Sequence, residues 1–349
     1  MAVHLLTYSL TSRPHRRRGW RAVLLTSALA ACALVAACSS GGAVGTVPAA
    51  PTRLASPSPP PPESGSSATP VSGWAAPMPV LTNGTGLAPV SCPSASFCMA
   101  GGAYQTFTYN GSSWSGPQSL GPSGNSLWSF SCASASFCMA VGEQYAFTFN
   151  GSSWSSPRVL AASDLVSVSC PSVSFCAAVG PDRAITYNGS SWSRPTRIIF
   201  DGGLSSVSCA SATFCMAVGA AHAVTYNGST WSAPQPAGPE GAPDSVSCPT
   251  ASFCAVADVH DALIYNGSSW SEPVLIDPGG VPDSISCPSA SFCMAVDAYG
   301  NAITFDGSSW SKPDAVDPTT LPNGFEYVSC PSDTFCMVAE GTGNAVIYR

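Results

Sequence analysis

Short apolar runs alternate with polar turn residues along most of this chain. The stretch from Ser206 to Pro236 holds four runs rich in Val, Phe, Tyr, Thr or Trp, each too short for a stable helix. Each run is therefore predicted to be a β-strand. Asn227-Gly228 separates the third run from the fourth, and both residues tolerate the positive φ angles of a tight hairpin turn.

This stretch is one of seven copies, and each copy carries two cysteines separated by five residues. The first cysteines lie 38 to 43 residues apart, a period typical of repeated supersecondary units. Four strands in about forty residues, repeated around an axis, form the blade of a β-propeller. The sequence therefore predicts an all-β, seven-bladed propeller with four strands per blade over residues 74–349.

The two ends of the repeat region predict how the ring closes. The seventh copy stops at Arg349, after its third strand, and lacks the Asn-Gly turn and the Trp-Ser-x-Pro strand of the other copies. A matching strand precedes the first cysteine pair, at residues 74–81. This N-terminal strand is expected to supply the outer strand of the last blade, because an open ring would leave a free sheet edge. A linear solenoid would need polar caps instead.

These features resemble the β-propeller superfamily with its strand-swap closure. Within it, residues 74–349 look similar to the Kelch-like and sialidase-type repeats of exported bacterial proteins. The turn from Thr225 to Trp231 is similar to the sialidase Asp-box, although it is one residue shorter and the copies mostly carry Asn. Because that box is structural in its family, the resemblance implies a turn and no catalysis.

The regular spacing of the cysteines predicts one disulfide in each blade. Each pair straddles the turn between the first and second strands, where cross-strand neighbours lie within disulfide reach. Zinc binding is the alternative, although zinc sites favour closer pairs or histidines, and the chain after residue 38 has only His222 and His260. Redox catalysis would favour Cys-x-x-Cys. The expected pairs are Cys92–Cys98, Cys132–Cys138, Cys170–Cys176, Cys209–Cys215, Cys248–Cys254, Cys287–Cys293 and Cys330–Cys336.

A basic head followed by an apolar stretch predicts a signal peptide over residues 1–37. The run Leu-Val-Ala-Ala before Cys38 resembles the bacterial lipobox, which implies that this cysteine receives diacylglycerol. Cys32 also fits the motif, and a plain secretory peptide is the alternative. Residues 38–73 are rich in Pro, Ser and Gly and are expected to form a semi-rigid linker. The protein is therefore expected outside the cytoplasmic membrane, attached to it only through its lipid.

The charge of the chain limits its partners. After residue 38 the chain has 7 Lys and Arg against 19 Asp and Glu, a net charge of −12 (7 − 19). Nucleic-acid binding needs basic patches, so this balance argues against it. A monomer that binds an extracellular protein or a glycan is expected.

Positions that differ between the copies are the candidates for function, because residues repeated in every copy serve the fold. In propellers, the loops between the second and third strands and the loops between blades emerge on one face. The repeated tryptophans are expected to pack the turns, with sugar stacking as the alternative. The predicted ligand-binding residues of that face are Tyr104, Trp128, Tyr145, Arg183, His222, His260 and Tyr299.

Three acids stand at equal offsets in consecutive copies. Asp244, Asp283 and Glu326 each lie four residues before a first cysteine, which predicts that they follow one side of the channel mouth. Carboxylates in such an arc suit Ca²⁺, a hard cation with oxygen ligands. The alternative is a set of solvated acids that keep the protein soluble. No other cofactor is expected.

The favoured function is a binding module for a protein, a glycan or a cell-wall ligand held at the loop face. A propeller-type glycan hydrolase or lyase is the first alternative, although arginines are few and two histidines do not define a catalytic triad. A passive structural module is the second alternative.

Overall fold

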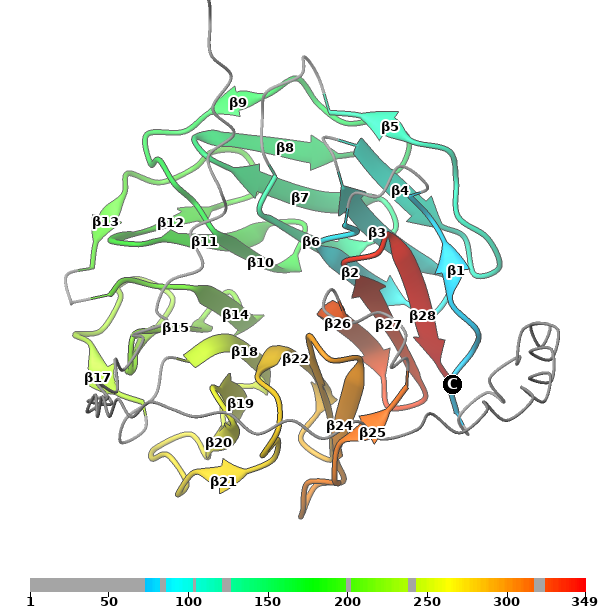
Figure 1. Cartoon of the computed structure of the whole chain (residues 1–349). Coiled ribbons are helices and arrows are strands. Elements are labelled where there is room, and N and C mark those ends of the chain that lie inside the picture. Colours follow the sequence, from blue (N-terminus) through cyan, green and yellow to red (C-terminus); the bar gives the residue numbers. More distant parts are fainter. Residues whose placement is uncertain are drawn as a thin grey trace, which may run out of the picture. The chain divides into compact units, whose positions relative to one another are not determined.

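Seven four-stranded antiparallel sheets form a ring in the computed structural model, which confirms the predicted seven-bladed β-propeller (Figure 1). The described residues are 73–81, 86–102, 105–120, 127–198, 202–237, 243–316 and 324–349, and they contain no helix. The predictions on the signal peptide, Cys32, Cys38 and Tyr104 lie outside these residues, as does the predicted linker up to residue 72.

In the first six blades the strands run in chain order from the ring centre outward, and in the last blade β26, β27 and β28 do so with β1 outermost (Figure 1). The innermost strands are β2 (Val90–Ser94), β6 (Ser129–Ser134), β10 (Ser167–Ser172), β14 (Ser206–Ser211), β18 (Pro243–Thr250), β22 (Pro282–Ser289) and β26 (Phe325–Ser332). The second strands are β3 (Phe97–Gly102), β7 (Phe137–Gly142), β11 (Phe175–Gly180), β15 (Phe214–Gly219), β19 (Phe253–Asp258), β23 (Phe292–Asp297) and β27 (Phe335–Glu340).

The third strands are β4 (Gln105–Tyr109), β8 (Tyr145–Phe149), β12 (Arg183–Tyr187), β16 (His222–Tyr226), β20 (Asp261–Tyr265), β24 (Asn301–Phe305) and β28 (Asn344–Tyr348). The outer strands are only two residues long: β5 (Gln118–Ser119), β9 (Arg158–Val159), β13 (Thr196–Arg197), β17 (Gln235–Pro236), β21 (Val274–Leu275), β25 (Asp314–Ala315) and β1 (Met78–Pro79). Short outer strands leave little free edge for unwanted pairing.

The N-terminal strand closes the ring as predicted. Strand β1 pairs antiparallel with β28, with Met78 opposite Ala345 and Pro79 opposite Asn344. Trp74 forms an additional β-bridge to Tyr348 and is 8% exposed. The last blade is therefore built from both ends of the repeat region.

All seven predicted disulfides are present, each joining the first two strands of a blade. In two blades the strand register places the cysteines directly opposite each other, as for Cys132 and Cys138. The second cysteine of each pair is fully buried. The spacing of five residues therefore encodes a hairpin cross-link and not a metal site.

Serine side chains join neighbouring blades near the ring centre. The serine before each first cysteine accepts a hydrogen bond from the backbone N–H of the first cysteine in the next blade, at 2.8–3.0 Å. The bond from Cys92 to Ser329 completes the circle between the first and last blades. These serines are Ser91, Ser131, Ser169, Ser208, Ser247, Ser286 and Ser329. The repeated Ser-Cys dipeptide thus satisfies backbone donors that a single blade would leave unpaired.

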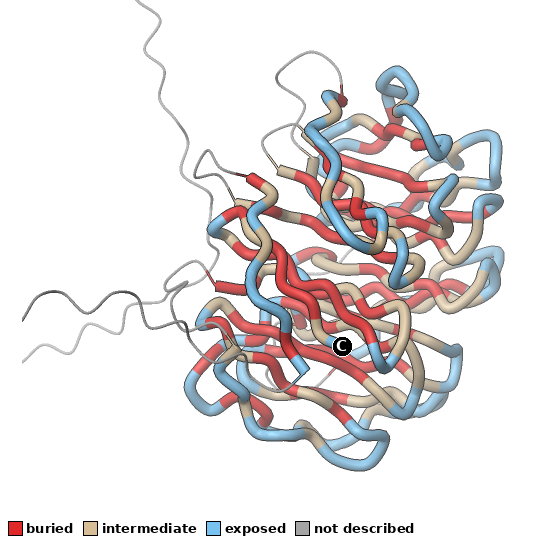
Figure 2. The backbone as a smooth tube through the Cα atoms, turned by 90° about the vertical axis from the view of Figure 1, so that its right-hand side faces the viewer, coloured by how far each residue is buried: buried red, intermediate tan, exposed pale blue. Residues whose placement is uncertain are grey.

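The hydrophobic core lies between blades, and Figure 2 shows the buried segments gathered in the sheets. Phe175 of one blade stacks on Tyr226 of the next at 5.8 Å, and the same contact joins Phe97 to Phe149 at 6.4 Å. The repeated tryptophans pack on the third strand of their own blade, as Trp231 does on Tyr226 at 5.3 Å. The tryptophan contacts agree with the packing role predicted for that series.

The Asn-Gly turns lie against the disulfide hairpins. Oδ1 of Asn110 accepts hydrogen bonds from the N–H groups of Ser112 and Ser113, and Gly111 has a φ of 93°. A Cβ on Gly111 would lie 3.3 Å from Cα of Ser96, in the disulfide turn. Both kinds of turn therefore occupy one face of the ring, which we call the disulfide face.

Candidate functional site

The opposite face carries the turns between second and third strands and the connections between blades. Backbone hydrogen bonds tie these two kinds of loop together, for example from Leu165 N–H to the Glu143 carbonyl at 3.2 Å and from Ile276 N–H to the His260 carbonyl at 3.0 Å. These loops vary in sequence from blade to blade. We call this surface the variable-loop face.

The residue four positions before each first cysteine has an equivalent place in every blade. In the first four blades its backbone N–H binds a carbonyl of the second strand, as Trp128 binds Val141 at 2.9 Å. In the last three blades the innermost strand is longer and this residue sits at a β-bulge. The seven residues are Ala88, Trp128, Val166, Ser205, Asp244, Asp283 and Glu326.

The three predicted acids thus occupy matching bulges on β18, β22 and β26. Burial raises the pKa of Asp244, and the charge of Asp258 raises it further. Glu326 and Asp283 both approach Tyr327, whose pKa is raised to about 12 by burial of the phenol and then by these carboxylates. Among the described residues no group of three or more His, Cys, Asp or Glu could hold a metal ion. Calcium binding by the three acids stays a prediction.

A second set of acids replaces glycine in the same three blades. The last residue of the second strand is glycine in the first four blades and Asp258, Asp297 or Glu340 in the others. These carboxylates are 6%, 0% and 0% exposed. Asp297 accepts hydrogen bonds from the N–H groups of Tyr299 and Asn301 at 2.9 and 2.8 Å and so shapes its turn.

Asp277, in the connection between the fifth and sixth blades, forms a buried pair with Asp297. A Cβ on Gly280 would lie 2.3 Å from Oδ2 of both, so the two oxygens face the same point. Burial raises the pKa of Asp277, and its hydrogen bond to Asp297 and the charge of that neighbour add to the rise. Protonated Asp277 can donate to Asp297, which places one proton between two buried carboxyl groups.

The substitution Asp277→Asn is expected to stabilise the protein at neutral pH. The pKa of Asp277 is higher in the folded chain than its ordinary value of 3.8, so its contribution to stability is complete below that value and is lost as the pH rises through the folded-state pKa. An asparagine amide donates to Asp297 at every pH. We expect a melting temperature higher by roughly 3 °C at pH 8 and equal to wild type near pH 3.5.

The exposed acid Asp333 provides the control, because Asp333→Asn changes the net charge equally on the disulfide face. It should leave the melting temperature within about 1 °C at both pH values. A variant Asp277→Asn that melts below wild type at pH 8 would show that the pair is held by something other than a shared proton.

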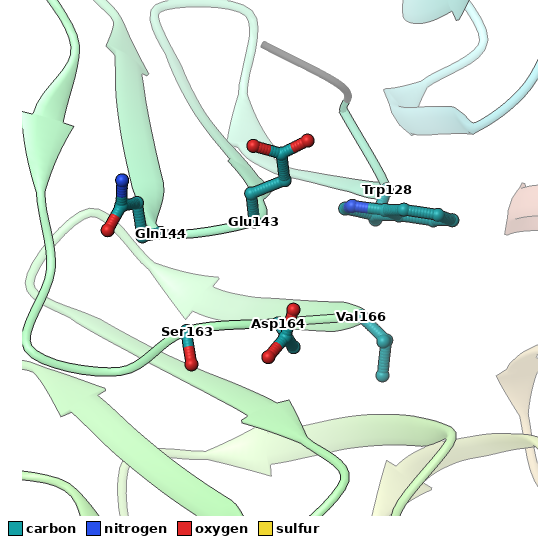
Figure 3. A pocket seen from close by; sticks show the side chains of 6 residues that line it. All are labelled: Trp128, Glu143, Gln144, Ser163, Asp164 and Val166. Carbon is teal, nitrogen blue, oxygen red and sulfur yellow. The ribbon is translucent and has the colours of Figure 1, made fainter. Parts of the chain in front are cut away.

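A pocket of about 360 Å³ opens on the variable-loop face between the second and third blades. Figure 3 shows the indole of Trp128 and the carboxyl groups of Glu143 and Asp164 around the same hollow. Gln144, Ser163 and Val166 complete its wall. Trp128 is 42% exposed, which is a large exposed fraction for a tryptophan. Its indole stacks on no other aromatic ring among the described residues.

The other predicted ligand-binding residues are spread over the face. Tyr145 packs partly against the core between the first and second blades. Arg183 forms an ion pair with Asp182 at 3.1 Å, and the Nδ1 atoms of His222 and His260 contact backbone carbonyls. Tyr299 is 48% exposed. Of the described candidates only Trp128 lines the pocket, and ligand binding by all of them stays a prediction.

Sequence reasoning missed four residues of interest: Ser163, Val166, Asp277 and Tyr327. Tyr327 had a usable signal, because five of the other copies carry serine three residues before the first cysteine. Asp277 had none, since its partner Asp297 is twenty residues away (297 − 277) in the next blade. The contact depends on how the two blades pack.

No protein-family profile matches the chain, and no curated protein sequence matches it. Solved propellers match its structure. The structure of YCF48 bound to the D1 peptide has a TM-score of 0.63 at 14% identity and covers 80% of this chain and 98% of that one. Streptogramin B lyase has a TM-score of 0.69 at 8% identity, covering 78% and 97%. The Pan2 WD40 domain of Neurospora crassa has a TM-score of 0.63 at 9% identity, covering 76% and 90%.

Identities this low show the propeller fold alone, and propellers serve many functions. Among the residues that the structure describes, no helix is long and apolar enough to span a membrane. The class of protein is therefore a disulfide-linked, seven-bladed β-propeller with a pocket on its variable-loop face.

Proposed function

We propose that this protein binds a segment of a partner protein on its variable-loop face, with the pocket at Trp128 as the principal contact. The observation that carries the proposal is an exposed tryptophan beside two acids in a pocket at the junction of three loops. Exposed aromatic side chains in pockets are frequent anchors of protein interfaces. The fold is compatible with such a role, because the similar YCF48 propeller is seen with a bound peptide.

The proposal includes export and attachment to the membrane through a lipid on Cys38, on the strength of the lipobox-like run before it. Labelling with a palmitate analogue should mark the wild type and fail to mark Cys38→Ala. The similarity of the Asn-Gly turns to the Asp-box supports the further proposal that the blades belong to the Kelch-like or sialidase-type group.

A photo-crosslinking amino acid at two positions tests the binding function in cells. A crosslinker at Gln144 lies in the pocket wall, whereas one at Ser112 lies on the disulfide face. We expect a protease-sensitive adduct of defined mass from position 144 and none from position 112. Equal adducts from both positions, or none from 144, would contradict the proposal. An adduct removed only by glycosidases, or turnover of a glycan, would support the hydrolase or lyase alternative.

A further inference from the structure

The walls of the pocket combine one aromatic face with two carboxylates and carry no positive charge. Glu143 and Asp164 form no ion pair or side-chain hydrogen bond among the described residues. Trp128 supplies an exposed ring surface beside them (Figure 3). A tryptophan face attracts a cation, and nearby carboxylates strengthen the attraction and give it direction. From this combination, and building on the proposed function, we infer that the pocket receives a lysine or arginine side chain of a basic partner segment.

The described residues do not supply that cation themselves. The described part of the chain has six Lys and Arg residues, and only Arg183 and Arg197 adjoin the variable-loop face. Both form ion pairs with Asp182, with distances of 3.1 and 3.9 Å from Nε of Arg183 and Nε of Arg197 to the carboxylate oxygens. The other four are Arg158, Arg194, Lys312 and Arg349. Arg158 bonds the carbonyl of Ser190, in an Asn-Gly turn, and Arg349 bonds the Tyr109 hydroxyl. Among the described residues, therefore, no cation neutralises the negative charge beside Trp128, and we assign that role to the partner.

The backbone around the pocket is held in place, so the two acids need little rearrangement to bind. Leu165 N–H binds the Glu143 carbonyl at 3.2 Å, and Leu160 N–H binds the Gln144 carbonyl at 2.8 Å. Asp164 has a φ of 58°, a conformation that costs energy for a residue with a side chain. Its carbonyl lies so close to β11 that a Cβ on Gly180 would approach it to 2.7 Å. Such preorganisation reduces the entropy lost on binding.

The charge of the whole face favours the same partner. Beyond Glu143 and Asp164, the matching bulges of the last three blades bring Asp244, Asp283 and Glu326 to the variable-loop face. Complementary charge increases the association rate and selects basic partners over acidic ones. A neutral sugar would stack on Trp128 and could donate hydroxyl hydrogen bonds to the carboxylates of Glu143 and Asp164, but only a cation would neutralise their charge. The observations therefore favour a basic polypeptide over a glycan.

A randomised 12-residue peptide library, selected on the full-length chain in mild detergent, tests this inference. We expect selected peptides to share a lysine or arginine whose replacement by glutamine weakens binding at least about tenfold. The double variant Glu143→Gln with Asp164→Asn should weaken binding to a similar degree. Trp128→Ala should abolish it, and added salt should reduce it for the wild type.

The control is the double variant Glu272→Gln with Asp314→Asn, which removes two exposed acids outside the pocket and should leave the affinity unchanged. Peptides that bind through Trp128 but need no basic residue would overturn the inference and leave peptide binding intact. Peptide binding indifferent to Trp128→Ala would overturn both the inference and the assigned site. Binding of neutral glycans on an array would contradict the inference if Trp128→Ala abolishes it and Glu143→Gln with Asp164→Asn does not. The ligand of the pocket would then be a sugar and not a basic segment.

Discussion

Removal of residues 73–81 is expected to open the ring and to destabilise the protein more than the loss of any single disulfide. Strand β1 is the outer strand of the last blade, and without it the edge of β28 is unpaired. Trp74 and Leu81 would also leave the cores on either side of that blade. Loss of a buried tryptophan alone costs about 3–5 kcal/mol, so the truncated chain should melt far lower or aggregate.

Differential scanning calorimetry of the purified chain gives the measurement. Deletion of residues 39–65 serves as the control, because this segment lies outside the residues that the structure describes as the propeller. That deletion should leave the melting temperature unchanged. A synthetic peptide with the sequence of residues 73–81 should pair with β28 and so partly restore the melting temperature of the truncated chain. Equal melting temperatures for the two deletions would rule out closure of the ring by β1.

Reduction of the seven disulfides is expected to have the second large effect. Each closes a short loop with a sequence separation of 6, which stabilises the folded chain by about 2 kcal/mol in the loop-entropy account. Ion pairs contribute little, because only 9% of residues are charged. The combined loss should unfold the propeller at temperatures where the oxidised protein is stable.

Removal of one cross-link provides a graded version of this experiment. Cys170→Ala with Cys176→Ala should lower the melting temperature by roughly 5 °C in the oxidised protein. Once both proteins are fully reduced, the variant and the wild type should have the same melting temperature. Mass spectrometry of the unreduced chain should find seven links within blades. A melting temperature that is the same before and after reduction of all seven disulfides would show that strand pairing alone holds the blades.

Much of the architecture could be predicted because its causes are local and repeated. Residues within one blade determine the disulfide hairpin, as at Cys170 and Cys176, and the tight turn, as at Asn227-Gly228. The repeat of four short strands also follows from the sequence of each copy. Seven copies of each pattern reduce the ambiguity of any single one. The N-terminal strand was also predictable, because its Trp-x-x-Pro pattern matches a strand missing from the seventh copy.

The candidate site was predicted only in part, because its contacts join loops of different blades. The copies differ in sequence at Trp128, Glu143 and Asp164, which marks all three as variable loop residues. This difference could not show that these three line one hollow, since their separation in the sequence says nothing about the packing of two connections and a turn. Ser163 and Val166 carry no chemical signal that would single them out.

The sequence by itself determined the number of blades, the disulfide pairs and the closing strand, because short-range turns and strand pairing follow from residue type and spacing. Only the tertiary structure decided which acids are buried and which are exposed. Asp277 and Asp297 look in the sequence like ordinary loop acids, yet the packing of two blades buries both carboxyl groups and raises the pKa of Asp277. Burial of a charge depends on the surroundings in three dimensions, and these are set by the whole ring.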